Sequence, residues 1–431
     1  MADPATSNRI FSMLHSSFLS LTGVVVSCAL LGAGCTRVVN RTIPASTSTP
    51  GVVAPIVAPS TTETLSSPTS TVLSEGNASQ LVFLEGAMPD LGKTSFIMTL
   101  GTEQMRGRYE SSKAKGAIYG RSSGTSTNDL LIFSFYLGDE ETFVFEGRYA
   151  STTGEFAGSV KRSSEAVSQP IKLATKLPKE GANIKLQKIE LGQAFRKGVS
   201  CHTTLEYPVI LPSNYIPAER ANELNQRIRF FLGEVATTTL QMRVEQTHAE
   251  CLLMQEEMVA SQPTTQEEEN GLNDYEYETT TLVNRNERGL LSLVYATYTF
   301  TGGAHPNSFS LSQAFDLTTG KEVTINTLVR PEALATWVQR EQQALLRSEY
   351  AEALFDREVA EKLASGKMSK EEAVQTAAYG SLDQWYVNGN TLVRYYQPYE
   401  ITPYAAGMPS IELPFTSWKD LALPGVERWF R

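Results

Sequence analysis

The chain has 431 residues, of which 41% are hydrophobic and 19% are charged, a composition that supports a buried core and excludes disorder throughout. Lys and Arg number 37 against 47 Asp and Glu, giving a net charge of −10 without a basic cluster, which disfavours nucleic-acid binding. Only four His and four Cys are present. We therefore expect no metal site and no cofactor.

Residues 1–35 have the pattern of an export signal. Residues 10–34 carry no charge, and their apolar run is short for a membrane span, which needs roughly 20 apolar residues. The run ends in Leu31-Gly32-Ala33-Gly34-Cys35, which resembles the lipobox of bacterial lipoproteins, although Gly32 stands where an apolar residue is usual. The resemblance implies lipid on Cys35, with an uncleaved signal anchor or simple secretion as the alternatives. All three predict an extracytoplasmic protein, and the first two a membrane-anchored one.

A Ser/Thr/Pro-rich linker is predicted over residues 36–79. Between residues 42 and 74, Glu63 is the only charged residue. Such a segment cannot bury enough apolar surface to offset its chain entropy, so we expect an extended tether before the folded body.

Cys201 and Cys251 are the only cysteines after the predicted signal peptide. In an oxidising compartment they could pair, and closing a loop of about 50 residues would stabilise the fold by about 4 kcal/mol. The alternative is two unpaired buried thiols. The sequence favours the disulfide, because both cysteines lie beside predicted structured segments.

Residues 80–178 predict an all-β domain. Short apolar runs at 96–100, 130–137 and 142–145 alternate with Gly, Ser and Asp clusters, and no helical period is present. Residues 105–109 (MRGRY) recur at 145–149 (FEGRY), and a Gly-x-x-x-Gly segment follows each copy. Repeated hairpins of this kind predict a small antiparallel β-barrel or β-sandwich, with Tyr109 and Tyr149 packing inside.

Residues 185–431 predict an α+β domain, with helices packed on an antiparallel sheet, so the whole chain belongs to the α+β class. Helices are expected from Pro217, from Pro331, over 355–364 and over 369–377. Strands are expected over 275–283, 290–300, 308–316, 322–324, 381–387 and 391–396.

Two segments of this domain carry a recognisable signature. The first is 298–307 (YTFTGGAHPN) followed by 315–321, and the second is 395–407 (YYQPYEITPYAAG) ending at 411–414. Together they resemble the RsiV-type C-terminal domain, a domain-of-unknown-function family numbered 3298. With the preceding segment (family 4163) the domain also occurs in the non-catalytic part of the peptidoglycan deacetylase PdaC. The resemblance spans residues 200–431. It implies binding of a lysozyme-like, cell-wall-active protein or of peptidoglycan glycan.

The same residues support two interpretations. Gly, Pro and Asn at these positions are typical of structural turns. Alternatively, exposed tyrosines beside a carboxylate would form a groove that stacks on a sugar or contacts a protein. The binding candidates are His305, Asn307, Tyr395, Tyr396, Tyr399, Glu400 and Tyr404.

Catalytic motifs are missing from the sequence. His202, His248 and His305 lie far apart, whereas the deacetylases hold a metal with an Asp and closely spaced His residues. No Gly-x-Ser-x-Gly, Walker or His-Glu-x-x-His pattern occurs. The sequence therefore predicts a surface-tethered binding protein that is not an enzyme. The alternative is a cell-wall hydrolase or deacetylase of unrecognised type.

Overall fold

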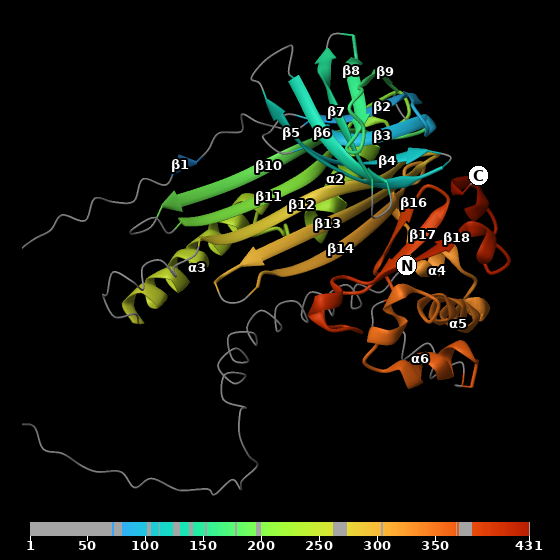
Figure 1. Ribbon diagram of the computed structural model, residues 1–431. Helices are drawn as coiled ribbons and strands as arrows, with labels where there is room; N and C mark the ends of the chain where they lie inside the picture. Colours follow the sequence, from blue (N-terminus) through green and yellow to red (C-terminus); the bar gives the residue numbers. More distant parts are fainter. Residues whose placement is uncertain are drawn as a thin grey trace, which may run out of the picture. The chain divides into compact units, whose positions relative to one another are not determined.

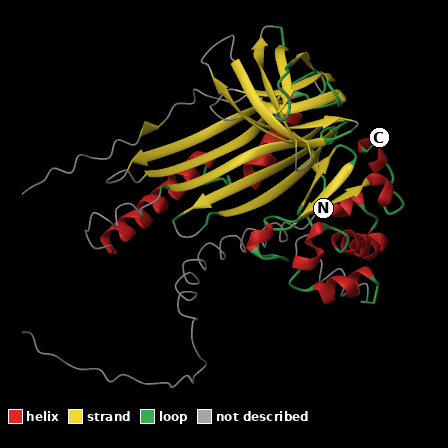
Figure 2. Ribbon diagram, viewed as in Figure 1, coloured by secondary structure: helices red, strands yellow, loops and turns green. Residues whose placement is uncertain are grey.

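The computed structural model describes residues 71–72, 80–100, 105–111, 113–123, 130–137, 141–150, 153–176, 179–194, 200–261, 274–302, 305–367, 369 and 382–430 (Figure 1). The predicted lipobox with Cys35, nearly all of the predicted linker and nearly all of the helix expected over 369–377 lie outside these residues. Beyond residue 200 helices join the strands, whereas the described residues between 80 and 176 form strands and loops (Figure 2). The α+β class and the all-β N-terminal part are confirmed.

No helix in the described ranges combines the length and the apolar character needed to span a membrane.

The N-terminal part is a closed antiparallel sheet, which we call the barrel. Each of its strands pairs with the next along the chain, and Leu84 of the first strand also pairs with Thr175 of the last, which closes the ring. Of the two predicted architectures, the structure therefore has the barrel. Its strands are β2 (Gln80–Met88), β3 (Gly92–Leu100), β4 (Met105–Ser111), β5 (Lys115–Ser123), β6 (Leu130–Leu137), β7 (Glu141–Ala150), β8 (Glu155–Arg162) and β9 (Gln169–Thr175).

The sequence repeat corresponds to two equivalent hairpins, β4–β5 and β7–β8. Tyr109 and Tyr149 are buried in the barrel core, together with Phe96, Phe145 and Phe156 among others. The repeated glycines allow close backbone approach, because a Cβ atom on Gly107 would lie 2.2 Å from the Ile97 carbonyl oxygen. The repeat therefore encodes barrel packing.

A second run of strands follows in the order β10-β11-β12-β13-β14-β15. Their bounds are β10 (Asn183–Ala194), β11 (Ser200–Leu211), β12 (Tyr275–Glu287), β13 (Leu290–Phe300), β14 (Asn307–Asp316) and β15 (Lys321–Glu322). This sheet is antiparallel, as expected, except that β11 and β12 are parallel. A parallel pair needs a long crossover, and the two helices between these strands supply it.

Those two helices are α2 (Ala218–Phe231) and α3 (Leu240–Ser261). Pro217 precedes α2, as predicted, and the helix buries Ala221, Leu224 and Ile228. On β13, Leu291, Leu293 and Tyr295 alternate with Ser292 and Val294, and the first three share a hydrophobic cluster with α2. One face of this sheet is therefore covered by α2.

The C-terminal residues cover the opposite face. They form α4 (Ile325–Leu328), α5 (Leu334–Leu345) and α6 (Arg357–Ala364), with an antiparallel sheet of β16 (Trp385–Asn388), β17 (Thr391–Tyr395) and β18 (Ser410–Pro414). Ser292 accepts a hydrogen bond from the Val387 N–H of β16 at 3.0 Å, which joins the two sheets. Trp337 and Trp418 belong to the apolar cluster beneath, and their ring centroids are 5.3 Å apart.

The barrel and the following sheet are joined by pairing between their strands. Gln80 of β2 pairs with Lys185 of β10, and a short strand, β1 (Thr71–Val72), pairs with β10 at Leu191 and Gly192. The described residues from 71 onward belong to one compact unit. The predicted division into domains at 80–178 and 185–431 stays a prediction.

Candidate binding surface

Two loops that are almost 100 residues apart in sequence meet beside the end of β13. The Tyr404 hydroxyl donates a hydrogen bond to the Pro306 carbonyl oxygen at 2.6 Å. The His305 ring stacks on the Tyr404 ring with centroids 4.0 Å apart, and the Tyr399 ring lies 5.6 Å from Tyr404. We call His305, Tyr399 and Tyr404 the aromatic cluster. It brings together residues from both signature segments.

Tyr399 is the exposed tyrosine of the cluster, with 55% of its surface accessible, whereas Tyr404 is half-buried. Its backbone has φ of 66°, a left-handed conformation that is unfavourable for a bulky residue. The surrounding turn supports it, because the Glu400 N–H donates to the Gln397 carbonyl oxygen at 3.1 Å and the Gln397 N–H donates to Glu400 Oε2 at 2.7 Å. This turn holds a large ring at the surface.

The expectation that Tyr395 and Tyr396 are exposed is wrong, since each is only 3% accessible. The Tyr395 hydroxyl donates to Ser312 Oγ at 3.0 Å, and burial raises the pKa of Tyr395 to about 12. The Tyr396 hydroxyl donates to Glu341 Oε1 at 2.8 Å. Both side chains find polar partners inside the fold, which is the usual requirement for burying a tyrosine. They therefore support the surface from beneath.

A buried ion pair lies beside Tyr396. Arg394 Nε and Glu341 Oε1 are 3.0 Å apart, and both side chains are 3% accessible. The Arg394 guanidinium also lies 4.7 Å from the centre of the Tyr396 ring. Glu341 Oε1 accepts from Arg394 and from Tyr396, and Arg394 also donates to the Gln384 carbonyl oxygen, whereas Glu341 Oε2 is buried without a hydrogen bond among the described residues.

Glu400 is half-buried and is not the exposed carboxylate that the sequence suggested. Its Oε2 accepts from the Gln397 N–H, and it also accepts from Gln384 at 2.9 Å when the Gln384 amide nitrogen faces it. Burial raises the pKa of Glu400 above its ordinary value. Its role here is to hold the turn that carries Tyr399.

Asn307 is exposed and begins β14, where it pairs with Thr299. Thr299 Oγ1 donates to the Asn307 carbonyl oxygen at 3.4 Å. This contact uses the backbone of Asn307, so the structure assigns its side chain no part in the aromatic cluster.

Acidic residues that were not among the candidates border the cluster. Glu278 of β12 pairs directly with Tyr298 of β13, and Glu276 pairs with Phe300. Burial, with contributions from Glu276, Tyr404 and Glu278, raises the pKa of Tyr298. The sequence signal was the alternation Tyr-Glu-Tyr-Glu at 275–278, which places both carboxylates on one face of a strand.

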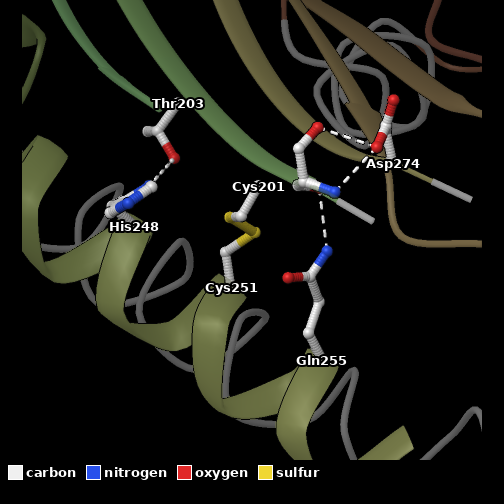
Figure 3. Close-up of a disulfide and its surroundings, with 7 residues drawn as sticks. Cys201, Thr203, His248, Cys251, Gln255 and Asp274 are labelled. Atoms are coloured by element: carbon white, nitrogen blue, oxygen red, sulfur yellow. Dashed lines mark hydrogen bonds between the residues drawn. A yellow bond between two sulfur atoms is a disulfide. The ribbon is translucent and has the colours of Figure 1, made fainter. Parts of the chain in front are cut away.

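Cys201 of β11 and Cys251 of α3 form a disulfide, with Cα atoms 6.3 Å apart (Figure 3). On one side of it, Thr203 and His248 are hydrogen-bonded at 3.3 Å, and burial lowers the pKa of His248. On the other side, Gln255 Nε2 donates to the Ser200 carbonyl oxygen at 2.8 Å. These contacts fix α3 on β11.

Within the described ranges, no three His, Cys, Asp or Glu side chains lie close enough together to hold a metal ion.

Comparison with protein families confirms the resemblance seen in the sequence. Residues 197–308 match the family model described as deacetylase PdaC, and residues 340–416 match that of a family of unknown function, DUF3298. Each family model covers less than half of the chain, and the aromatic cluster draws His305 from the first match and Tyr399 and Tyr404 from the second. The resemblance to family 4163 stays a prediction.

Solved structures of the same family are similar to part of the chain. A DUF3298 family protein from Bacteroides fragilis has 18% identity and a TM-score of 0.40, and covers 58% of this chain and 98% of its own. One from Pseudomonas aeruginosa has 15% identity and a TM-score of 0.32, covering 56% and 95%. Comparison with curated proteins gives no match.

Proposed function

We propose that the protein is an extracytoplasmic, surface-tethered binding protein of the cell wall, which recognises a basic, lysozyme-like protein through the aromatic cluster. The observation that carries the proposal is the aromatic cluster, in which the exposed His305 stacks on the half-buried Tyr404 and the exposed Tyr399 lies beside Tyr404 in a tilted arrangement. Tyrosine is enriched at the centres of protein interfaces, where a rigid ring contributes area at little entropic cost.

The acidic border supports a basic partner. Glu276 lies opposite Phe300 and has no cationic partner among the described residues, whereas Glu278 is paired with Arg106 at 3.0 Å, and the whole chain carries a net charge of −10. Charge complementarity of this kind accelerates association and selects among partners. The extracytoplasmic location is supported by the Cys201–Cys251 disulfide, since such bonds persist in oxidising compartments, and by the signal-like N-terminus. Membrane attachment through Cys35 or a signal anchor belongs to this proposal.

A peptidoglycan strand is the second candidate ligand, because the exposed Tyr399 ring could also stack on a sugar. The competing class is a cell-wall hydrolase or deacetylase, which the name of the PdaC family model suggests. We favour binding, because the His305 ring is stacked on Tyr404 and its Nδ1 contacts the Pro306 carbonyl oxygen at 3.0 Å. These contacts suit a structural part of a contact surface.

Binding of the full-length protein to immobilised lysozyme and to soluble peptidoglycan fragments tests the proposal. Tyr399→Ala is expected to weaken lysozyme binding about thirtyfold, which corresponds to about 2 kcal/mol for a hot-spot aromatic residue. Phe230→Ala is the matched control, because Phe230 is 47% accessible and lies on α2, outside the cluster. Rising salt should weaken the complex.

Two results would contradict the proposal. Absence of binding to both probes would remove the binding function. Turnover of a glycan that is lost in His305→Ala would assign the protein to the enzymes instead.

A further inference from the structure

A second exposed aromatic residue lies beside the turn that carries Tyr399. Phe355 follows a short 3₁₀ helix, η5 (Glu349–Ala353), and precedes α6, and its N–H donates a hydrogen bond to the Ile401 carbonyl oxygen at 2.9 Å. Ile401 is two residues from Tyr399, so the Cα atoms of these two residues are at most about 7.6 Å apart. The connection at Phe355 and the Tyr399 turn are therefore neighbours, although α6, β16 and β17 separate them in sequence.

The connection between η5 and α6 is anchored in the core by Leu354, not by Phe355. Leu354 packs against the apolar cluster that contains Tyr396, whereas Phe355 has 55% of its surface accessible. Among the Phe and Tyr side chains whose burial is described, only Tyr399 is equally exposed. Exposed aromatic rings that lie near each other are typical of contact surfaces. We therefore treat Phe355 as part of the same surface as Tyr399.

An unpaired carboxylate comes directly after this ring. Asp356 is exposed and is the N-cap residue of α6, but its side chain makes no capping hydrogen bond. Within the described part of the chain, this side chain has no other hydrogen bond and no ion pair. The neighbouring Glu352, by contrast, is paired with Arg357 at 2.7 Å, and residues 349–356 contain no Lys or Arg. The charge beside Phe355 is therefore negative and free to pair with a partner.

A ring beside an unpaired carboxylate suits one kind of partner group, a cationic side chain. Lys and Arg have an apolar stem that packs on a ring and a charge that pairs with a carboxylate. An apolar partner group would bury Asp356 without a hydrogen bond, and an acidic group would be repelled by it. Phe355 and Asp356 together therefore select for positive charge.

We propose that Phe355 and Asp356 form a second anchor beside Tyr399, which takes one Lys or Arg side chain of the protein partner. The stem of that side chain packs on the Phe355 ring, and its charge pairs with the Asp356 carboxylate. The inference rests on the proposed function, because it assigns a further group of the partner to the same surface. Neither residue belongs to the two signature segments, and the anchor selects a basic partner without Glu278, which is already paired with Arg106.

Binding of the full-length protein to immobilised lysozyme and, separately, to a soluble hexa-arginine peptide tests the proposal. Phe355→Ala should weaken lysozyme binding about tenfold, the loss expected for one aromatic anchor. Asp356→Asn keeps a residue that suits an N-cap, and it should weaken both complexes about two- to fivefold at low salt, because exposed charge pairs contribute little. At about 0.5 M salt the effect of Asp356→Asn should disappear, whereas that of Phe355→Ala should remain.

Glu257→Gln is the matched control for Asp356→Asn, because Glu257 is also exposed and unpaired among the described residues but lies on α3. Circular dichroism of each variant would establish that the fold is retained. Combining Phe355→Ala with Tyr399→Ala separates contact from positioning. If Phe355 contacts the partner, the two losses of affinity should multiply. No further loss in the double variant would mean that Phe355 only holds the Tyr399 turn, and would overturn the proposal.

The outcomes for this anchor and for the proposed function can be told apart. Lysozyme binding that is weakened by Tyr399→Ala but unchanged by Phe355→Ala and Asp356→Asn would overturn the second anchor and leave the proposed function standing. Hexa-arginine binding that depends on Asp356 and not on Glu257, without any binding of lysozyme, would support the anchor and remove lysozyme as the partner. No binding of either probe, or equal effects of Asp356→Asn and Glu257→Gln, would overturn the anchor.

Discussion

The barrel and the region beyond residue 200 differ in how many polar side chains they bury. Among the side chains whose burial is described, Thr94 is the only fully buried polar one in the barrel. The later region buries many, including Arg285, Asn286, Glu341 and Arg394, and each of these four makes hydrogen bonds across elements.

This difference indicates which region depends on specific polar contacts to fix the positions of its backbone segments. The barrel depends on shape, because apolar rings fill its interior and glycines let its strands approach. The later region must hold long irregular loops at fixed positions, and buried polar groups that require specific partners can do so. The aromatic cluster lies on those loops.

The largest expected effect is the loss of stability when a buried aromatic residue is removed from either core. Phe145→Ala in the barrel and Trp418→Ala in the later region should each cost about 3–5 kcal/mol of unfolding free energy. All four tryptophans lie between residues 337 and 429, so tryptophan fluorescence reports only the later region. Comparing fluorescence with far-ultraviolet circular dichroism during denaturation shows whether Phe145→Ala unfolds the barrel alone. Coincident transitions would mean that the two regions unfold together.

Removing one partner of the buried Arg394–Glu341 pair tests whether buried polar contacts stabilise the region beyond residue 200. Glu341→Leu leaves the Arg394 charge buried without its carboxylate and also removes the acceptor of the Tyr396 hydroxyl. We expect a loss of about 3–5 kcal/mol, measured by denaturant unfolding. The double variant with Arg394→Leu should recover part of that loss. A single variant as stable as the wild type would show that the pair contributes nothing.

Loss of the disulfide should have an intermediate effect. Replacing Cys201 and Cys251 by Ser is expected to lower stability by about 2–4 kcal/mol. Hydrogen exchange should increase first in α3, because the disulfide is its one covalent link to β11 and the hydrogen bonds of His248 and Gln255 to β11 would remain. Uniform acceleration across the barrel would contradict this local role.

The smallest expected effect concerns Glu400. Burial raises its pKa in the folded state, so the folded protein binds this proton more tightly than the unfolded chain does. The resulting stabilisation is fully present below the ordinary pKa of 4.5 and is lost as the pH rises through the folded-state value. Compared with Glu400→Gln, the wild type should therefore lose stability as the pH rises above the ordinary pKa of 4.5. Parallel pH profiles would contradict the assignment.

Periodicity predicted much of the fold. Alternating strands, the helices after Pro217 and Pro331 and the repeated hairpins are all present. Helix α3 was missed, although its buried positions Leu240, Val244, His248, Cys251 and Gln255 recur at helical spacing. Three of these five residues are polar or were assigned to a disulfide, so hydrophobicity alone does not reveal the stripe.

The candidate surface was predicted in part. Proximity of the two signature segments could be expected, and His305, Tyr399 and Tyr404 do lie together. The sequence could not predict which tyrosines are exposed. Tyr395 and Tyr396 acquire their buried partners, Ser312 and Glu341, only through tertiary contacts. Sequence pattern carries no information on such partners.

Closure of the barrel has a kinetic consequence. The hairpins of the barrel are local in sequence, but Leu84 can meet Thr175 only when the intervening strands are all available, so the closing pair has a large sequence separation. Until that moment both outer strands present unpaired edges that could capture another chain. For the nascent protein, the interval between synthesis of β2 and of β9 is therefore the period of greatest aggregation risk, and a slow barrel-forming phase should follow release of the chain.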